Sequence, residues 1–326
     1  MGYNVDMNYS GVSVAITGGT GFIGSHLINH LIKHNATIFV LCRDKFSNGV
    51  LKSDEINIVY GNATKKEDVD YFIEKSKPDI FIHLAAQTQA LYSMDYPYET
   101  IFNNTISTLN ILESLSKYKK CKIAIVASSD KSYGKLLSDE YTEDHILGGI
   151  FPYDASKSIT DILVNTYRNT NGLNITSIRH CNVYGPGDMN FQRLIPGIAK
   201  SKFNNKEFLL RNMGNDIREY IYIDDVIDAY DYVIEYLEKN NDIPAFNIGS
   251  GDRLSSLEVF NIINKNLENS ISLKLEPPVY GEINKQIMNY DLLNEKTKWV
   301  PKCSAEEYMP YTAKWYIDYF NKNKKL

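Results

Sequence analysis

The chain has 326 residues, enough for about two domains of ordinary size, and its 43% hydrophobic and 23% charged residues are typical of a folded globular protein. Its 35 basic and 40 acidic residues give a net charge of −5, which argues against a main role in binding nucleic acid. No apolar run approaches the ~20 residues that cross a bilayer, and the first residues lack the basic and apolar regions of a signal peptide. We therefore expect a cytoplasmic protein that binds neither nucleic acid nor a membrane.

Short apolar runs alternate with helix-like stretches from residue 12 onward. The runs typical of strands cover residues 12–16, 36–41, 56–60, 79–84, 121–127 and 175–179. The stretches typical of helices cover residues 22–33, 66–75, 98–115 and 154–169. Strands that are apolar on both faces and separated by helices indicate parallel pairing. The sequence therefore predicts a doubly wound parallel α/β sheet over residues 12–187, after a polar arm at residues 1–11.

The rhythm changes after residue 187, where shorter and more mixed elements follow. Helices are expected near residues 192–200, 224–237 and 255–267. We expect residues 188–326 to form a smaller mixed α/β lobe that binds the substrate. The apolar run at residues 245–248 can return to the main sheet, so residues 224–250 are expected to rejoin the first domain.

The four cysteines are widely spaced, and none belongs to a Cys-x-x-Cys pair. They are Cys42, Cys121, Cys181 and Cys303. This pattern supports neither a disulfide framework nor a zinc site, so we expect no metal.

A glycine-rich segment, TGGTGFIG at residues 17–24, follows the first expected strand and opens the first expected helix. In this position glycines allow a tight turn and let the backbone approach a pyrophosphate at the positive end of the helix. We interpret the segment as the phosphate loop of a Rossmann-type dinucleotide-binding domain. The expected contacts are Gly18, Gly21, Phe22, Ile23 and Gly24.

The end of the second strand is where a residue should contact the adenosine ribose. An acidic side chain there binds the 2′-hydroxyl of NAD, whereas an arginine accommodates the 2′-phosphate of NADP. Cys42 takes the expected place of the acid, Arg43 follows it, and Asp44 can still reach the hydroxyl. These residues leave both NAD and NADP open.

Tyr153 and Lys157 are four residues apart at the start of an expected helix, which puts both side chains on one face. A tyrosine is a poor base at neutral pH, but a neighbouring ammonium favours the phenolate. Ser129, at the carboxyl end of an expected parallel strand, can hydrogen-bond a sugar hydroxyl that Tyr153 deprotonates. Asp130 and Lys131 follow it as a candidate proton donor and acceptor.

Several motifs together resemble extended short-chain dehydrogenase/reductases, and more narrowly the nucleotide-sugar 4,6-dehydratase and epimerase branch. They are the glycine loop, HLAAQ at 83–87, SSDKSYG at 128–134, YDASK at 153–157 and NVYGPG at 182–187. Ser129-Asp130-Lys131 and GDMNFQRLIP at 187–196 are similar to CDP-glucose 4,6-dehydratases. Most other sugar 4,6-dehydratases have Asp-Glu where this chain has Asp130-Lys131.

The resemblance implies three steps on one tightly bound, recycled NAD or NADP. The sugar is oxidised at C4 with the help of Ser129, Tyr153 and Lys157, water is lost across C5 and C6, and the hydride returns to C6. Asp130 would protonate the departing hydroxyl, and Lys131 is the candidate base. A lysine base requires a neutral amine, hence a depressed pKa.

The resemblance also assigns binding residues and a partner. A nucleotide diphosphate sugar would contact Arg218, Arg193, Asn182, Asn104, Ser129 and Thr88, and the cofactor would contact Asn62, Ala63, Leu84, Ala85, Ala86, Gln87, Tyr153 and Lys157. The helices at residues 98–115 and 154–169 resemble those that form a homodimer interface in the family, and a symmetric dimer is a common state.

Two other functions stay open. A C4 epimerase or C4 dehydrogenase of a nucleotide-linked hexose or heptose needs Ser129, Tyr153 and Lys157 but no elimination pair. A regulatory module that senses redox state would bind the dinucleotide without turning over a sugar.

Overall fold

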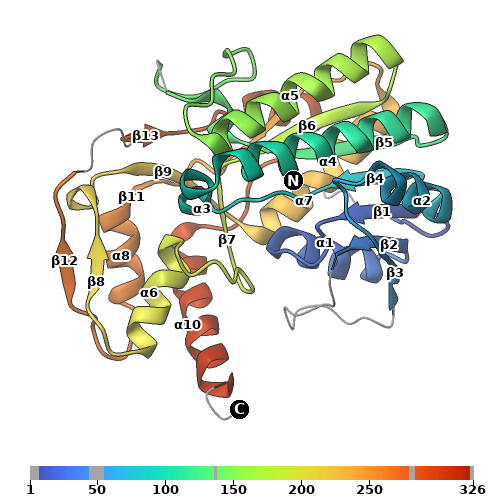
Figure 1. Ribbon diagram of the computed structural model, residues 1–326. Helices are drawn as coiled ribbons and strands as arrows, with labels where there is room; N and C mark the ends of the chain where they lie inside the picture. Colours follow the sequence, from blue (N-terminus) through green and yellow to red (C-terminus); the bar gives the residue numbers. More distant parts are fainter. Residues whose placement is uncertain (1–6, 44–54, 136–137, 279–282, 324–326) are drawn as a thin grey trace.

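A seven-stranded parallel sheet forms the centre of the computed structural model, which describes residues 7–43, 55–135, 138–278 and 283–323 (Figure 1). The strand order is β10-β6-β5-β4-β1-β2-β3. The strands are β1 (Ser13–Thr17), β2 (Thr37–Cys42), β3 (Asn57–Tyr60), β4 (Ile80–His83), β5 (Ile123–Ser129), β6 (Ile175–His180) and β10 (Phe246–Ile248). The order reverses between β1 and β4, which is where such sheets bind ligands. The predicted doubly wound α/β sheet is confirmed.

Helices cover both faces of this sheet (Figure 1). One face carries α2 (Lys66–Ser76), α4 (Pro97–Tyr118) and α5 (Pro152–Asn171), which pack against one another. The other face carries α1 (Phe22–Lys33) and α7 (Ile223–Lys239).

Strand β1 shows why the strands are apolar on both faces. Val14 and Ile16 belong to the core that includes Leu27 of α1, whereas Ala15 belongs to the core that includes Phe72 of α2. All six strands expected before residue 187 begin and end within two residues of the expected bounds. The expected helices of this part are also present, with α4 and α5 extending two or three residues further at one end or both.

The second lobe is built from short strands and three main helices. A mixed sheet joins β7 (Asn182–Tyr184), β9 (Ile217–Tyr222), β11 (Arg253–Ser255) and β13 (Lys285–Gln286), and a pair joins β8 (Phe208–Leu210) to β12 (Leu273–Leu275). The helices are α6 (Leu194–Phe203), α8 (Ser256–Asn264) and α10 (Ala305–Asn323). Shorter elements of this part are α9 (Asp291–Thr297) and the 3-10 turn η3 (Asn212–Gly214), whereas α3 (Ala90–Asp95) and the 3-10 turn η2 (Asp130–Tyr133) lie beside the central sheet. The sequence did not predict these short strands, because a strand of two to six residues is too short to show a recognisable hydrophobic periodicity.

The chain passes between the two lobes several times. After β9 it returns to the main sheet through α7, which packs on α1, and then through β10, which pairs in parallel with β6. It then goes back to the second lobe at β11. In the described part of the N-terminal arm, Tyr9 is buried and its hydroxyl donates to Asp231 of α7 at 2.6 Å.

The turn that follows β5 is fixed at both ends. The Ser129 hydroxyl accepts the backbone N–H of Lys131 at 3.3 Å and begins η2. The turn ends at Gly134, whose backbone has φ +72° and ψ −132°. A side chain on Gly134 would overlap the carbonyl oxygen of Gly148, a backbone atom that cannot move aside.

We expect Gly134→Ala to lower the free energy of unfolding by about 2–4 kcal/mol, because strain from the left-handed backbone adds to the overlap. Urea unfolding measures this difference. Gly148→Ala is the matched control in the same loop, since its added carbon would lie 3.7 Å from the Tyr133 carbonyl oxygen, an ordinary contact. A change of more than about 0.5 kcal/mol in the control, or none in Gly134→Ala, would contradict this view of the turn.

Candidate active site

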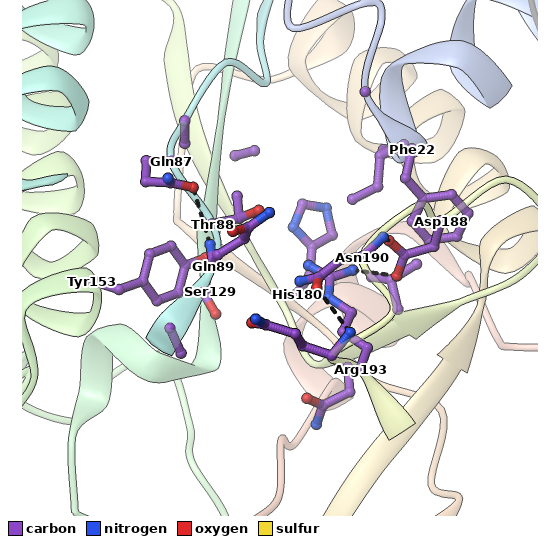
Figure 2. Close-up of a pocket in the computed structure, with 18 of the residues that line it drawn as sticks. Phe22, Gln87, Thr88, Gln89, Ser129, Tyr153, His180, Asp188, Asn190 and Arg193 are labelled. Atoms are coloured by element: carbon purple, nitrogen blue, oxygen red, sulfur yellow. Dashed lines mark hydrogen bonds and ion pairs between the residues drawn. The ribbon is translucent and has the colours of Figure 1, made fainter. Parts of the chain in front are cut away.

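A cavity of about 1200 Å³ lies at the carboxyl edge of the parallel sheet. The ends of β1, β4, β5 and β6 contribute to one wall, through residues such as Thr17, Ser129 and His180. Figure 2 shows Ser129, Tyr153 and Gln87 on one side of the cavity and Asp188, Asn190 and Arg193 on the other. The cavity therefore lies between the two lobes, at the reversal point of the sheet.

Nearly every residue that the sequence assigned to the site lines this cavity. They are Gly18, Gly21, Phe22, Ile23, Gly24, Arg43, Asn62, Ala63, Leu84, Ala85, Ala86, Gln87, Thr88, Asn104, Ser129, Asp130, Lys131, Tyr153, Lys157, Asn182 and Arg193. Asp44 lies outside the described residues, and Arg218 does not line the cavity.

The glycine loop is packed closely against the end of β4. Gly18 has φ +73°, and a side chain there would bring a carbon within 2.5 Å of the Ala85 nitrogen. Gly21 begins α1 without a side-chain cap, and the first turn of the helix has no acidic residue. Unused N–H groups at the positive end of a helix suit the pyrophosphate of a dinucleotide, so the residues present fit this group. Arg43 and Asn62 line the cavity and also an adjoining smaller pocket, to which Lys65 contributes.

Helix α5 places Tyr153 and Lys157 on one wall. It begins at Pro152, which suits the first turn of a helix, and ends at Asn171, followed by the capping residue Gly172, whose φ is +65°. The Lys157 Nζ donates to the carbonyl of Ala127 in β5 at 2.8 Å and lies 6.0 Å from the centre of the Tyr153 ring.

Burial sets the ionisation of this pair. Burial lowers the pKa of Lys157 to about 8. Burial also raises the pKa of Tyr153 to about 12, although the charge of Arg193 and a hydrogen bond with Ser129 act to lower it. Tyr153 is therefore a protonated phenol at neutral pH, and it needs further positive charge nearby to accept a proton from a substrate.

Asp130 and Lys131 form an ion pair at the end of β5. The Lys131 Nζ lies 3.1 and 3.0 Å from the two carboxylate oxygens of Asp130, and the Ser129 hydroxyl donates to Asp130 Oδ1 at 2.9 Å. The Asp130 side chain is buried. The predicted proton donor and acceptor are thus in direct contact with each other and with the serine.

Asp154 is a cavity residue that sequence analysis missed, although it lies inside the YDASK motif. Burial raises the pKa of Asp154 to about 6; the charge of Lys131 lowers it and that of Asp130 raises it. Its Oδ2 is buried without a hydrogen-bond partner among the described residues. The signal in the sequence was an acidic residue directly after Tyr153. The charged groups around Asp154 are brought together by the fold and could not be predicted.

Asn104 holds the loop after β4 in place. Its Oδ1 accepts the backbone N–H of Gln87 at 2.7 Å, and its Nδ2 donates to the Gln87 carbonyl at 3.1 Å and to the Ser156 hydroxyl at 2.9 Å. These bonds engage both ends of the amide. The arrangement favours a role in positioning Gln87, whereas the sequence predicted a contact with substrate.

The opposite wall carries polar residues from the GDMNFQR segment. Arg193 Nη1 forms an ion pair with Asp188 Oδ2 at 2.9 Å, and the Asp188 carboxylate also accepts the N–H of Asn190 at 3.0 Å. The Asn182 amide donates to the Glu219 carbonyl at 3.0 Å. Arg193 therefore lies at the cavity wall, and the bonds made by Asp188 hold its loop in place.

Arg218 lies on β9 between Leu254 of β11 and Gln286 of β13. Its Nη1 donates to the carbonyl of Ile217 at 2.9 Å. Tyr220, two residues along the same face of the strand, does line the cavity. The structure thus puts Arg218 next to the cavity wall rather than in it, and its contact with a diphosphate stays a prediction. Arg211 lines the cavity instead, and a single arginine in a loop gives no signal in the sequence.

The described residues include no helix long and apolar enough to cross a bilayer. Within the same ranges, no group of three or more His, Cys, Asp or Glu side chains is arranged to hold a metal ion.

A doubly wound sheet with a glycine loop, a strand-end serine and a Tyr-x-x-x-Lys helix defines an extended short-chain dehydrogenase/reductase. More specifically, the chain belongs to the NAD dependent epimerase/dehydratase family, whose model matches residues 14–249. These residues include the glycine loop, Ser129, Tyr153 and Lys157.

Relatives in this family carry out different reactions. The chain is 33% identical over 265 residues to a dTDP-D-glucose 4,6-dehydratase of Dictyostelium discoideum, covering 76% of this chain and 60% of that protein's length. It is 28% identical to a putative UDP-glucose 4-epimerase of Methanocaldococcus jannaschii, covering 93% of this chain and 97% of the relative. The solved structure of the Thermotoga maritima UDP-glucose 4-epimerase is 27% identical, covers 95% and 99% of the two chains, and superposes with a TM-score of 0.84. The family alone thus does not choose between dehydration and epimerisation.

We expect Lys157→Met to be more stable than the wild type near pH 7 and to lose this advantage as the pH rises. Unfolded lysine has a pKa of 10.5 and folded Lys157 one of about 8, so between these values the unfolded wild-type chain binds more protons. The stability of the wild type therefore rises across this window relative to the variant, by about 2–3 kcal/mol. Urea unfolding at pH 7 and near pH 10 tests this, with Lys314→Met on the surface of α10 as the control for loss of a lysine. A difference that does not change with pH would contradict the expectation.

Proposed function

We propose that the protein is a nucleotide-sugar 4,6-dehydratase, similar to CDP-glucose 4,6-dehydratases. The observation that carries this proposal is the Asp130–Lys131 ion pair beside Ser129 in the cavity that also holds Tyr153 and Lys157. Oxidation at C4 needs only the serine, tyrosine and lysine. An adjacent acid and base are what the elimination of water requires in addition.

The first step uses Tyr153 and Ser129. Ser129 would hydrogen-bond the C4 hydroxyl while Tyr153 accepts its proton, and the Lys157 ammonium on the same helix face would stabilise the phenolate. A nicotinamide dinucleotide, held by the glycine loop with Arg43, Asn62, Ala63, Leu84, Ala85, Ala86 and Gln87, would supply the hydride acceptor and later the hydride donor. The 4-keto group so formed acidifies the hydrogen on C5.

The ion pair offers a direct way to prepare the elimination. A proton passed from Lys131 to Asp130 across the 3.0 Å contact leaves a neutral amine and a carboxylic acid. The amine then takes the C5 proton, the acid protonates the C6 hydroxyl, and the C5–C6 double bond forms as water leaves. Hydride added to C6 and a proton added to C5 complete the 4-keto-6-deoxy product.

The substrate would be a nucleotide diphosphate hexose. Arg193 faces the cavity from the second lobe, and Arg211 and Arg218 lie at or near the same wall. Guanidinium groups bind diphosphate oxygens well. Thr88 and Asn182 would contact the sugar and its phosphate. The free thiols of all four cysteines agree with a cytoplasmic location.

A C4 epimerase is the second candidate function. It is supported by the 27% identical Thermotoga maritima epimerase structure, which covers nearly the whole of both chains. The two functions differ in the role of Asp130.

We expect Asp130→Asn to lower the rate of dehydration by about 10²–10⁴-fold, because the elimination loses its acid. Oxidation at C4 should persist, so absorbance of the reduced nicotinamide should accumulate on the protein. The assay is mass spectrometry of CDP-, GDP-, UDP- and dTDP-linked hexoses incubated with the protein, in which the product is lighter by one water.

Asp139→Asn, at a fully exposed carboxylate, is the matched control and should behave as the wild type. Tyr153→Phe should abolish both dehydration and reduction of the nicotinamide. A product of unchanged mass from the wild type would replace the dehydratase by the epimerase. Full dehydration by Asp130→Asn would show that Asp130 is not the acid of the elimination.

We infer that two copies of the chain associate through α4 and α5, which lie side by side (Figure 1). Tyr98 and Phe102 of α4 are 79% and 43% exposed, and their rings stack at 5.7 Å. Ile162 of α5 is 54% exposed. Exposed apolar side chains on two helices packed side by side are typical of a protein interface.

Phe102→Glu should therefore convert a dimer into a monomer, because it would place a charge in an apolar interface. Sedimentation velocity measures the mass of each species. Tyr311→Glu, at a 55% exposed aromatic residue of α10, is the control and should stay dimeric. A monomeric wild type would rule out this interface.

A further inference from the structure

Asp161 is a buried carboxylate one helical turn beyond Lys157 and two turns beyond Tyr153, so all three side chains share a face of α5. Its Oδ2 accepts the hydroxyl of Ser128, and its Oδ1 accepts the hydroxyl of Ser177 and the Arg179 Nε–H, the last at 3.0 Å. Ser128 directly precedes Ser129. None of these groups takes part in the proposed reaction.

Lys157 has few charged neighbours on the elements packed around it. Strand β5 contributes the Ala127 carbonyl, β4 contributes His83, and β6 contributes His180. Burial lowers the pKa of His83 to about 3 and that of His180 to about 4, so both rings are neutral at physiological pH. The charge that favours the ammonium of Lys157 comes from Asp161, which raises its pKa against the effect of burial.

The position of Asp161 is fixed by a second set of bonds. Arg179 Nη1 donates to the Tyr133 hydroxyl at 2.6 Å, and its guanidinium lies 4.9 Å from the centre of the Tyr133 ring. The Tyr133 hydroxyl donates to the Asn247 amide oxygen in β10 at 2.7 Å. Tyr133 belongs to η2, the turn that carries Asp130 and Lys131. The Asp161 carboxylate is thus held by β5, β6 and, through Arg179, by η2.

We propose that Asp161 is a positioning residue that keeps Lys157 protonated inside the cavity while Tyr153 exchanges its proton. The proposal rests on the proposed function for the importance of the ammonium. The charge state of Lys157 can be measured without any sugar substrate. Asp161 would act only through Lys157.

The experiment compares the wild type with Asp161→Asn. Lys157 lines the cavity, and its neutral amine reacts with acetic anhydride, whereas the ammonium does not. The extent of acetylation of the Lys157 peptide, followed by mass spectrometry between pH 6 and 10, gives the apparent pKa. Removing the carboxylate should lower that pKa by about one unit or more, so labelling near pH 7 should rise about fivefold. In active protein, the alkaline limb of the pH–rate profile should move to lower pH.

Two further variants separate electrostatics from loss of structure. Asp161→Glu keeps the charge and should restore the wild-type labelling profile. Tyr133→Phe removes a hydrogen bond from Arg179 without touching Asp161, so it should lower stability and leave the labelling of Lys157 unchanged. If Asp161→Asn does not fold, the double variant Asp161→Asn/Arg179→Gln removes both buried charges. Labelling of Lys157 should still rise, but by less than in the single variant, because losing the positive charge of Arg179 acts in the opposite direction.

Wild-type labelling in a folded Asp161→Asn or double variant would overturn the proposal, as would an equal shift in Tyr133→Phe. A protein that shows the expected shift in labelling and yet dehydrates no sugar would refute the dehydratase alone. Asp161 would still be the group that sets the charge of Lys157. Dehydratase activity with unshifted labelling would refute only the role of Asp161.

Discussion

Helix α5 is held on the end of β5 by bonds from two charged side chains, and the candidate chemistry depends on that attachment. Lys157 reaches the carbonyl of Ala127 at 2.8 Å, and Asp161 accepts the hydroxyl of Ser128. Apolar packing is not directional and leaves a helix some freedom to shift on a sheet, whereas hydrogen bonds made away from water fix its position. Tyr153 comes from the helix and Ser129 from the strand, so their alignment follows from these bonds.

The same arrangement places several ionisable groups where water is largely excluded. Removing the charges of Lys157, Asp130 and Asp161 from water is unfavourable, and the cost is offset by an ion pair or by several hydrogen bonds at each carboxylate. Asp154 is the exception, since one of its oxygens has no partner among the described residues. A buried polar atom that lacks a hydrogen-bond partner at a cavity wall is typical of functional sites, where some stability is lost in favour of chemistry.

The sequence predicted the features that depend on neighbours along the chain. Strands such as β1 could be recognised because helices cover both of their faces, which makes them apolar throughout. The glycine loop and the Tyr-x-x-x-Lys pair could be recognised because their residues lie close together in the sequence. The position of Arg218 beside the cavity rather than in it could not be predicted, since it depends on how β9 pairs with β11 and β13. The environment of Asp161 could not be predicted for the same reason, because its partners Ser128 and Arg179 lie on strands β5 and β6, far along the chain from helix α5. Local spacing identifies a motif, and tertiary pairing decides what surrounds it.

The repeated passage of the chain between the lobes has a consequence for how such a protein changes over evolutionary time. Strand β10 belongs to the central sheet and helix α7 covers one of its faces. Because both lie between segments of the second lobe, that lobe is not one continuous stretch of sequence. It cannot be exchanged for another by a single recombination event without removing part of the dinucleotide-binding core. A new sugar or nucleotide specificity would therefore have to arise by substitution within the loops and short strands, such as those that present Arg193 and Arg211, while the sheet beneath them stays intact.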